Sequence, residues 1–336
     1  MTVSAGDLGV NEPSVAPEEV SKIVGRSPWQ IARGRLVRDK VSMAAFTVVC
    51  LYFVVALAAP FLQNWGIIDP LATHSSGPGN LLRLEDGMPQ GNFGGVSSSH
   101  WFGVEPQSGR DLLSRLVSGV TLSMLIAVSA TIFSIVVGTV TGIISGYSGG
   151  VVDAIFGRIF DLVLAFPQLL MLLALSVVLI EKITNLGVPA GNPSGVVYLI
   201  LVLGFFGFPY FARIIRGQVL SLREREFVEA ARSLGARGPR IWFTELLPNL
   251  WAPILVYTSL ILPANVSTEA ALSFLGVGVK SPTPTLGNVL TDSVNFLVAD
   301  PTYFFLPGFA IFAIVLSFNL LGDGLRDALD PKSDRH

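Results

Sequence analysis

Residues 116–152 read LVSGVTLSMLIAVSATIFSIVVGTVTGIISGYSGGVV and contain no aspartate, glutamate, lysine or arginine. A helix that crosses a hydrocarbon core of ~30 Å needs about 20 residues. The stretch is long enough for a transmembrane helix, which we place at 119–146. Gly149 and Gly150, followed by Asp153, predict a turn after this helix, so we expect one span here rather than two.

Five further uncharged runs are each long enough for one span. We place these spans at 42–63, 159–181, 196–216, 252–276 and 302–322. The chain is 51% hydrophobic and only 14% charged, whereas a soluble domain carries about 25% charged residues. The sequence therefore predicts an all-α integral membrane protein with six transmembrane helices, multi-pass in the cytoplasmic membrane and in contact with its lipid.

Basic residues orient the six spans, which place both ends of the chain on one side. If the N-terminus is cytoplasmic, 17 of the 22 lysines and arginines lie in cytoplasmic segments, as the positive-inside rule requires. We therefore expect both termini in the cytoplasm. The predicted divisions are a cytoplasmic tail (1–40), a first transmembrane helix (41–63), an extracytoplasmic segment (64–118), a five-helix core (119–322) and a second cytoplasmic tail (323–336).

The extracytoplasmic segment ends in GRDLLSRLVSG, residues 109–119. Leu112, Leu113, Leu116 and Val117 recur at helical spacing beside charged residues. This pattern predicts a short amphipathic helix that lies along the outer surface.

Gly138, Gly142 and Gly146 form a stripe of small residues along the span at 119–146. Such a stripe lets a second membrane helix approach closely, and we favour static packing over a sliding contact. Three other spans each contain a proline that predicts a kink: Pro167, Pro209 and Pro263.

Two acidic residues lie within the predicted spans. For Asp161 the sequence favours a local ion pair with Arg158, three residues earlier. Glu269 has no basic neighbour in sequence, and an ionisable group there should face protein or water. It either lines a translocation path or holds helices together, and Asn265, one turn earlier, is the second path candidate.

Motifs for enzymatic chemistry are absent from the sequence. It has no GxxxxGK[ST] phosphate-binding loop, its three histidines show no metal-ligand spacing, and no Ser/His/Asp arrangement stands out. We therefore expect no catalytic residue, no metal site and no cofactor bound by this chain. Nothing in the sequence suggests a nucleic-acid partner.

Between the fourth and fifth spans lies a charged loop, 217–250, that includes EFVEAARSLGARGPRIWFTELLP at 226–248. We predict a helix over 221–234, with Ser221 as its cap and Gly235 in the left-handed turn that ends it. The Arg-Gly-Pro sequence then starts a second short helix. The first helix has a narrow apolar face suited to a groove on a partner protein, made of Phe227, Ala230, Ala231 and Leu234.

The segment EAARSLGARGPRIWFTELLP resembles the EAA loop of ABC-importer permeases. Four other segments resemble the C-type permease subunit of the dipeptide/oligopeptide/nickel branch of that family: WFGVEPQSGRDLLSRLVSGVTLSML, YSGGVVDAIFGRIFDLVLAFPQLLM, ALSFLGVGVKSPTPTLGNVL and FNLLGDGLRDALDP. The resemblance covers roughly residues 100–331. It implies the type I ABC-importer permease fold. The family pattern has an apolar residue where this chain has Glu245.

The resemblance implies a permease subunit that imports di- or oligopeptides, or nickel or another small solute. Its implied partners are a homologous permease in a heterodimer, two cytoplasmic ATPase subunits that hold ATP and Mg, and an extracytoplasmic substrate-binding protein. The EAA loop would dock on an ATPase subunit. The residues expected to make this ATPase-coupling contact are Phe227, Glu229, Ala230, Ala231, Leu234, Gly235, Leu247 and Pro248.

Two other classes of protein are also compatible with the sequence. An ion-coupled secondary transporter would need paired acids or unwound helices near the membrane midplane, and its only candidates, Asp161 and Glu269, do not visibly pair. A membrane scaffold without transport is the third possibility. Adjacent genes for ATPases, a binding protein and a second permease would favour the importer alone.

Overall fold

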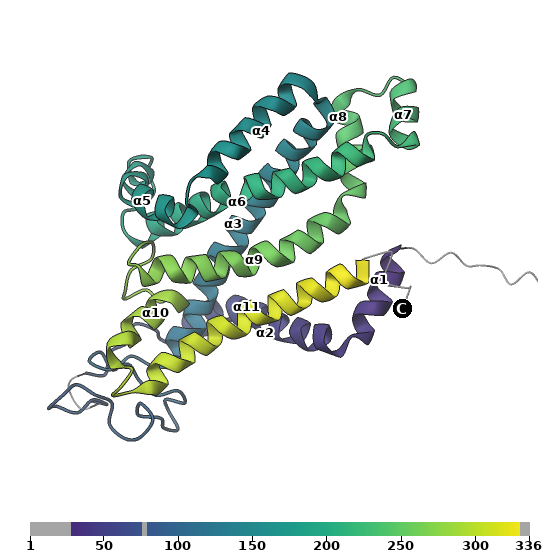
Figure 1. The fold of residues 1–336 in the computed structure, drawn as a ribbon. Helices are drawn as coiled ribbons and strands as arrows, with labels where there is room; N and C mark the ends of the chain where they lie inside the picture. The colour runs from purple at the N-terminus through teal and green to yellow at the C-terminus, as the bar shows by residue number, and fades with distance from the viewer. Residues whose placement is uncertain (1–27, 76–78, 330–336) are drawn as a thin grey trace, which may run out of the picture.

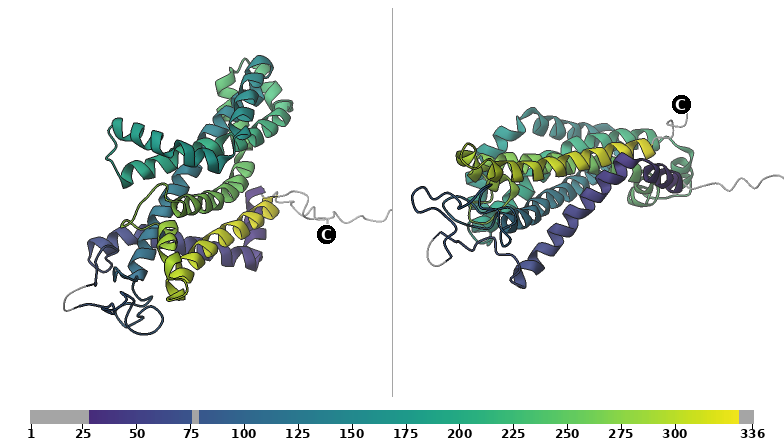
Figure 2. Two further views of the ribbon diagram at one scale, coloured as in Figure 1. Left: turned by 60° about the vertical axis from the view of Figure 1, so that its left-hand side comes forward. Right: turned by 90° about the horizontal axis from the view of Figure 1, so that it is seen from below.

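The computed structural model describes residues 28–75 and 79–329 of the chain (Figure 1). Parts of both predicted tails lie outside these residues. The regular elements of the described part are helices. The long helices run between two ends of the molecule, with residues 65–75 and 79–111 and α10 at one end and α1 and α7 at the other (Figures 1 and 2).

Five helices are long and apolar enough to cross a membrane: α2 (Lys40–Asn64), α3 (Leu112–Ser148), α5 (Gln168–Asn185), α6 (Asn192–Leu222) and α11 (Pro301–Leu329). A sixth span is formed if α9 (Trp251–Phe274) is taken together with the segment Gly238–Asn249, which meets it at a bend of 68°. The predicted all-helical membrane fold with six spans is therefore confirmed. The remaining helices are α1 (Pro28–Arg38), α4 (Gly150–Ala165), α7 (Glu226–Ser233), α8 (Gly238–Arg240), η1 (Ile241–Leu246), η2 (Leu247–Asn249), α10 (Leu286–Ser293) and η3 (Val294–Phe296).

The glycine stripe of α3 packs directly against the backbone of α6. A Cβ atom added at Gly142 would lie 2.7 Å from the carbonyl oxygen of Ala212, and one at Gly146 would lie 2.9 Å from that of Arg216. Gly138 meets α6 in the same way. Helices approach this closely only where side chains are absent. The packing predicted from the stripe is confirmed, with α6 as the partner helix.

The predicted surface helix at 109–119 is wrong, because these residues begin α3 itself. The Asp111 carboxylate accepts a hydrogen bond of 2.7 Å from the backbone N–H of Ser114 and so caps the helix at Leu112. The apolar side chains of Leu112 and Leu116 are buried in a core shared with α2, α9 and α11. Their amphipathic spacing reflects contact with protein rather than with the membrane surface.

The span predicted at 159–181 is also wrong, because it consists of two helices. α4 ends at Ala165 and α5 begins at Gln168, with Phe166 in an extended conformation (φ −84°, ψ 137°). A residue before proline is pushed out of the helical region, so Pro167 ends the helix instead of bending it. In addition, Asp161 forms its ion pair with Arg213 of α6, not with Arg158.

We predict that Gly142→Ala destabilises the protein, whereas Gly217→Ala does not. The new methyl group at Gly142 meets the α6 backbone, but nothing lies within 4 Å of the same position at Gly217. Alanine is otherwise favoured over glycine in a helix by about 1 kcal/mol. Thermal unfolding in lipid nanodiscs measures both variants. An equal midpoint for the two would contradict the tight α3–α6 contact.

Candidate functional site

The candidate site is the bracket, residues 226–249, which comprises α7, α8, η1 and η2. α7 is shorter than the predicted helix over 221–234, because α6 continues to Leu222 and Ser221 lies within it. Arg225, in an extended conformation, precedes α7 instead. Gly235 has φ +82°, so the predicted left-handed turn is confirmed. The second helical segment begins at Gly238–Pro239, as predicted.

The bracket is packed firmly onto the long helices. Val228 of α7 and Ile241 and Leu246 of η1 are 0% exposed. They belong to one buried cluster with residues of α3, α6 and α9. The guanidinium of Arg232 also lies 5.4 Å from the ring centre of Tyr147 at the end of α3. A force applied to the bracket therefore reaches three membrane helices through packed side chains.

Most of the predicted coupling residues remain available to a partner. Six of them are exposed: Phe227, Glu229, Ala230, Leu234, Gly235 and Pro248. Leu234 is 89% exposed, an unusual position for a leucine on a charged loop. Ala231 and Leu247 are partly buried against the cluster below. One face of α7 thus packs against the rest of the chain, and the residues on its other side are exposed.

The bracket surrounds a hollow of about 470 Å³. Its lining residues are Ala231, Leu234, Gly235, Ala236, Arg237, Arg240 and Glu245. The sequence did not identify the two arginines as site residues, although both follow Gly235 within the matched motif. Glu245, where the family pattern is apolar, supplies an acidic group to the same hollow. The hollow suits a partner surface that carries both positively and negatively charged side chains.

The base of the bracket is tied to the turn between α3 and α4. Asp153 accepts two hydrogen bonds from Arg216 of α6, at 2.5 and 2.6 Å, and a third of 2.6 Å from Ser145. The bonds from Arg216 lower the pKa of the Asp153 carboxyl to about 2. Arg223 donates a bond of 3.0 Å to the carbonyl oxygen of Gly146. These contacts fix the end of α6 where the bracket begins.

The two translocation-path candidates lie inside the helix packing. Glu269 is 0% exposed and accepts hydrogen bonds of 2.8 Å from both Ser123 and Ser273. Asn265 is 5% exposed and donates a bond of 2.9 Å to Thr131. Ser123 and Thr131 belong to α3, so both residues of α9 bind this helix. The structure favours the helix-holding role over the path-lining role for Glu269.

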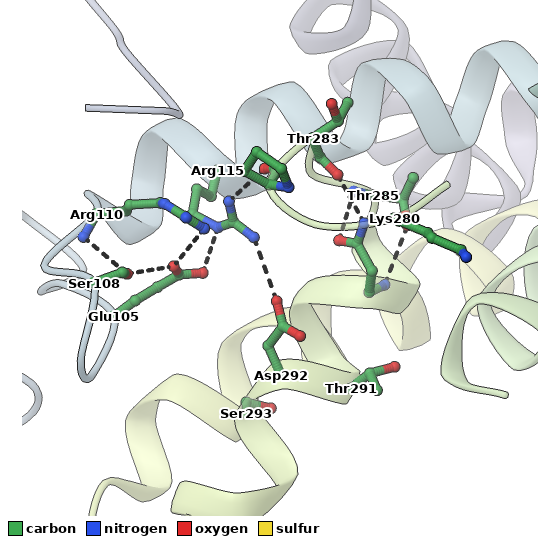
Figure 3. Close-up of polar contacts among 12 residues, drawn as sticks. Glu105, Ser108, Arg110, Arg115, Lys280, Thr283, Thr285, Thr291, Asp292 and Ser293 are labelled. Atoms are coloured by element: carbon green, nitrogen blue, oxygen red, sulfur yellow. Dashed lines mark hydrogen bonds and ion pairs between the residues drawn. The ribbon is translucent and has the colours of Figure 1, made fainter. Parts of the chain in front are cut away.

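A buried ionic network lies at the opposite end of α3 (Figure 3). Arg115 is 0% exposed. It pairs with Glu105 of the segment between α2 and α3, which is predicted to be extracytoplasmic and is called the outer segment, and it donates a bond of 2.8 Å to the carbonyl oxygen of Pro282. The hydroxyl of Tyr303, in α11, donates a bond of 3.0 Å to Glu105. The ion pairing and the hydrogen bonds offset the cost of burying these charges, and removing one partner of such a pair is strongly destabilising. The network joins the outer segment to α3, to α11 and to the loop before α10.

Comparison with known proteins identifies relatives along nearly the whole chain. Residues 138–335 match the family "Binding-protein-dependent transport system inner membrane component", and residues 27–77 match the "N-terminal TM domain of oligopeptide transport permease C". The dipeptide transport system permease protein DppC of Alkalihalophilus pseudofirmus is 34% identical over 98% of both chains. The glutathione transport system permease protein GsiD of Escherichia coli O1:K1 / APEC is 35% identical over 95% of this chain and 94% of that protein. Among solved structures, the inward-facing MetNI methionine ABC transporter has a TM-score of 0.48 at 20% identity and covers 65% of this chain and 98% of its own.

We predict that Asp153→Asn lowers thermal stability at pH 7, by an amount on the order of 1 kcal/mol after allowance for solvent at Arg216. Because the pKa of Asp153 is lowered in the folded state, its contribution is complete above about pH 4. It is lost as the pH falls towards 2. Melting curves from pH 7 to pH 3 should therefore show a constant difference that shrinks only at the acidic end.

Asp161→Asn is the matched control, because it removes an exposed ion pair between the same two helices, α4 and α6. Exposed pairs contribute little, so its melting curve should follow that of the unmodified protein. A larger loss of stability for Asp161→Asn than for Asp153→Asn would contradict the assignment.

Proposed function

The chain belongs to the family of binding-protein-dependent transport system inner membrane components, and we propose that it imports di- or oligopeptides as one of two permease subunits. It is a multi-pass membrane protein and the permease, not the ATPase, of an ABC importer. The names of its relatives, which are dipeptide and glutathione permeases, support the peptide substrate. Nickel or another small solute is the alternative cargo of the same machinery.

The observation that carries the proposed mechanism is the bracket. One face of the bracket is buried against three membrane helices, while Leu234 and its neighbours form an exposed face that is both apolar and charged. We propose that this face docks in a groove of an ATPase subunit in the cytoplasm, on the same side as both chain termini. A helix with exposed apolar anchors on one side is suited to such a groove.

The proposed complex contains this chain, a homologous permease, two ATPase subunits and an extracytoplasmic binding protein. ATP and Mg are held by the ATPase subunits, and this chain binds no cofactor. When the ATPase subunits close, they move the bracket, and the contacts of Val228 and Ile241 carry the movement into α3, α6 and α9. The passage between the two permeases then opens outward. Packed interfaces transmit such shifts because they switch between discrete arrangements.

We predict that Gly235→Val reduces ATP-driven uptake by about tenfold or more. A β-branched residue in the left-handed region costs about 1–2 kcal/mol, and the added side chain would project from the turn beside the hollow. Gly187→Val is the matched control, because Gly187 has φ +102° and open space around it but lies between α5 and α6, away from the bracket. Uptake by the complete complex in proteoliposomes, with copurification of the ATPase subunits, measures the effect. Equal uptake in the two variants would contradict the docking role.

The cargo is tested separately, in a strain that lacks this gene. We predict that the gene restores uptake of labelled di- and oligopeptides, and that an excess of unlabelled peptide competes while nickel does not. Restoration of nickel uptake alone would assign the alternative cargo. Peptide uptake that persists when the partner ATPase genes are deleted would instead indicate an ion-coupled transporter.

A further inference from the structure

A second hollow, of about 580 Å³, lies at the end of the molecule opposite the bracket. Its walls come from two segments that are far apart in sequence, Arg83–Gly94 of the outer segment and Ala299–Phe305 at the start of α11. We call it the Asp300 pocket.

The pocket takes its chemical character from a buried carboxylate. Asp300 is 4% exposed, and its Oδ1 accepts one long hydrogen bond of 3.4 Å from the backbone N–H of Tyr303. Its Oδ2 has no hydrogen-bond partner in the part of the chain that the structure describes. Gly94 lies so close that a Cβ atom there would be 2.7 Å from Oδ2. A buried acidic oxygen without a partner is costly, so this geometry calls for a donor from outside the chain.

Two aromatic side chains stand at the pocket beside this carboxylate. Phe93 is 78% exposed and Phe305 is 63% exposed, and both line the hollow. The backbone of Phe93 is left-handed (φ +51°), a strained conformation for a phenylalanine that is typical of ligand-binding segments. Aromatic faces attract cations and also pack against an aliphatic stem. The pocket therefore fits an ammonium or guanidinium group on an apolar chain.

The other charged groups at the pocket largely cancel. Arg83 and Asp86 lie at its edge, pair at 3.8 Å and are both about half exposed. Asp300 is thus the buried charge without a counterion in the hollow. The position of Asp300 is fixed through Tyr303, three residues later. The hydroxyl of Tyr303 is hydrogen-bonded to Glu105, which pairs with Arg115 in Figure 3.

The surroundings point to a protein as the source of the cation. Leu84, next to Arg83, is 92% exposed, and Val298, next to Ala299, is 96% exposed. Exposed large apolar side chains next to a pocket mark protein–protein contact sites. We propose that the Asp300 pocket receives a lysine or arginine side chain of the extracytoplasmic substrate-binding protein when that protein docks. This inference rests on the proposed importer function and names one of its contact points.

The test is the affinity of the purified binding protein for the complete importer complex in nanodiscs. Asp300→Asn removes the charge but keeps an oxygen that caps α11, since asparagine is an equally good helix cap. We expect the dissociation constant to rise by about tenfold or more. Glu85→Gln is the matched control, because it removes one exposed acidic charge from the same outer segment without lining the pocket. It should change the constant less than twofold.

A scan of the binding protein identifies the inserted side chain. One surface lysine or arginine, changed to alanine, should weaken docking to the unmodified complex and leave docking to the Asp300→Asn complex unchanged. The proposal is overturned if the Asp300→Asn complex docks the binding protein as the unmodified complex does. It is also overturned if the only effect of Asp300→Asn is the loss of bound phosphatidylethanolamine, a lipid that carries an ammonium group. ATP hydrolysis without binding protein should be equal in all variants. A complex that assembles with no ATPase subunit contradicts the proposed function itself, whatever the docking result.

Discussion

The close contact between α3 and α6 is the constraint on which the rest of the structure depends. Three glycines of α3 face the α6 backbone so closely that no side chain fits between the two helices. In a bilayer, where burial of apolar surface does not drive helix association, contact of this kind supplies the attraction. Because α6 leads directly into the bracket, the position of the bracket is set by this contact.

α3 also connects the two ends of the molecule. At its start, Arg115 binds Glu105 and the loop that precedes α10. In its middle, Ser123 and Thr131 bind Glu269 and Asn265 of α9. At its end, Ser145 and Gly146 bind the Asp153–Arg216–Arg223 group at the base of the bracket. A displacement of the bracket thus reaches the opposite end of the molecule through one helix of 37 residues.

Much of this arrangement can be predicted from the sequence, where a local pattern has a single physical meaning. Uncharged runs define the spans, the glycine stripe indicates close packing, and Gly235 indicates a left-handed turn. Prediction failed where two causes give the same pattern. The spacing of Leu112 and Leu116 suits a membrane surface as well as a protein core. Composition alone placed a continuous span across Phe166–Pro167.

Partners distant in sequence were beyond prediction for a different reason. Nothing near Asp161 indicates Arg213, and nothing near Arg115 indicates that Glu105 is buried beside it. Such pairs depend on the register between helices, which is set by packing over the whole molecule. The hollow beside Leu234 likewise depends on Arg240 and Glu245, which come after the turn and line it together with Leu234. The sequence motif located this region but not its concave surface.

The central claim, that the exposed face of the bracket contacts the ATPase subunit, is tested most directly by cross-linking. Cys50 is the chain's only cysteine, so a Cys50→Ser background accepts single cysteines. Leu234→Cys and Leu84→Cys place them at leucines that are 89% and 92% exposed. The first follows α7 and the second lies between α2 and α3, two parts of the chain at opposite ends of the molecule (Figure 1). The ATPase subunit carries introduced cysteines around its groove, and a short bifunctional maleimide is added to the complex. The reagent should cross-link the ATPase subunit to the Leu234→Cys variant and not to the Leu84→Cys variant. Failure of Leu234→Cys to react with the ATPase subunit, or equal reaction of Leu84→Cys, would contradict the account.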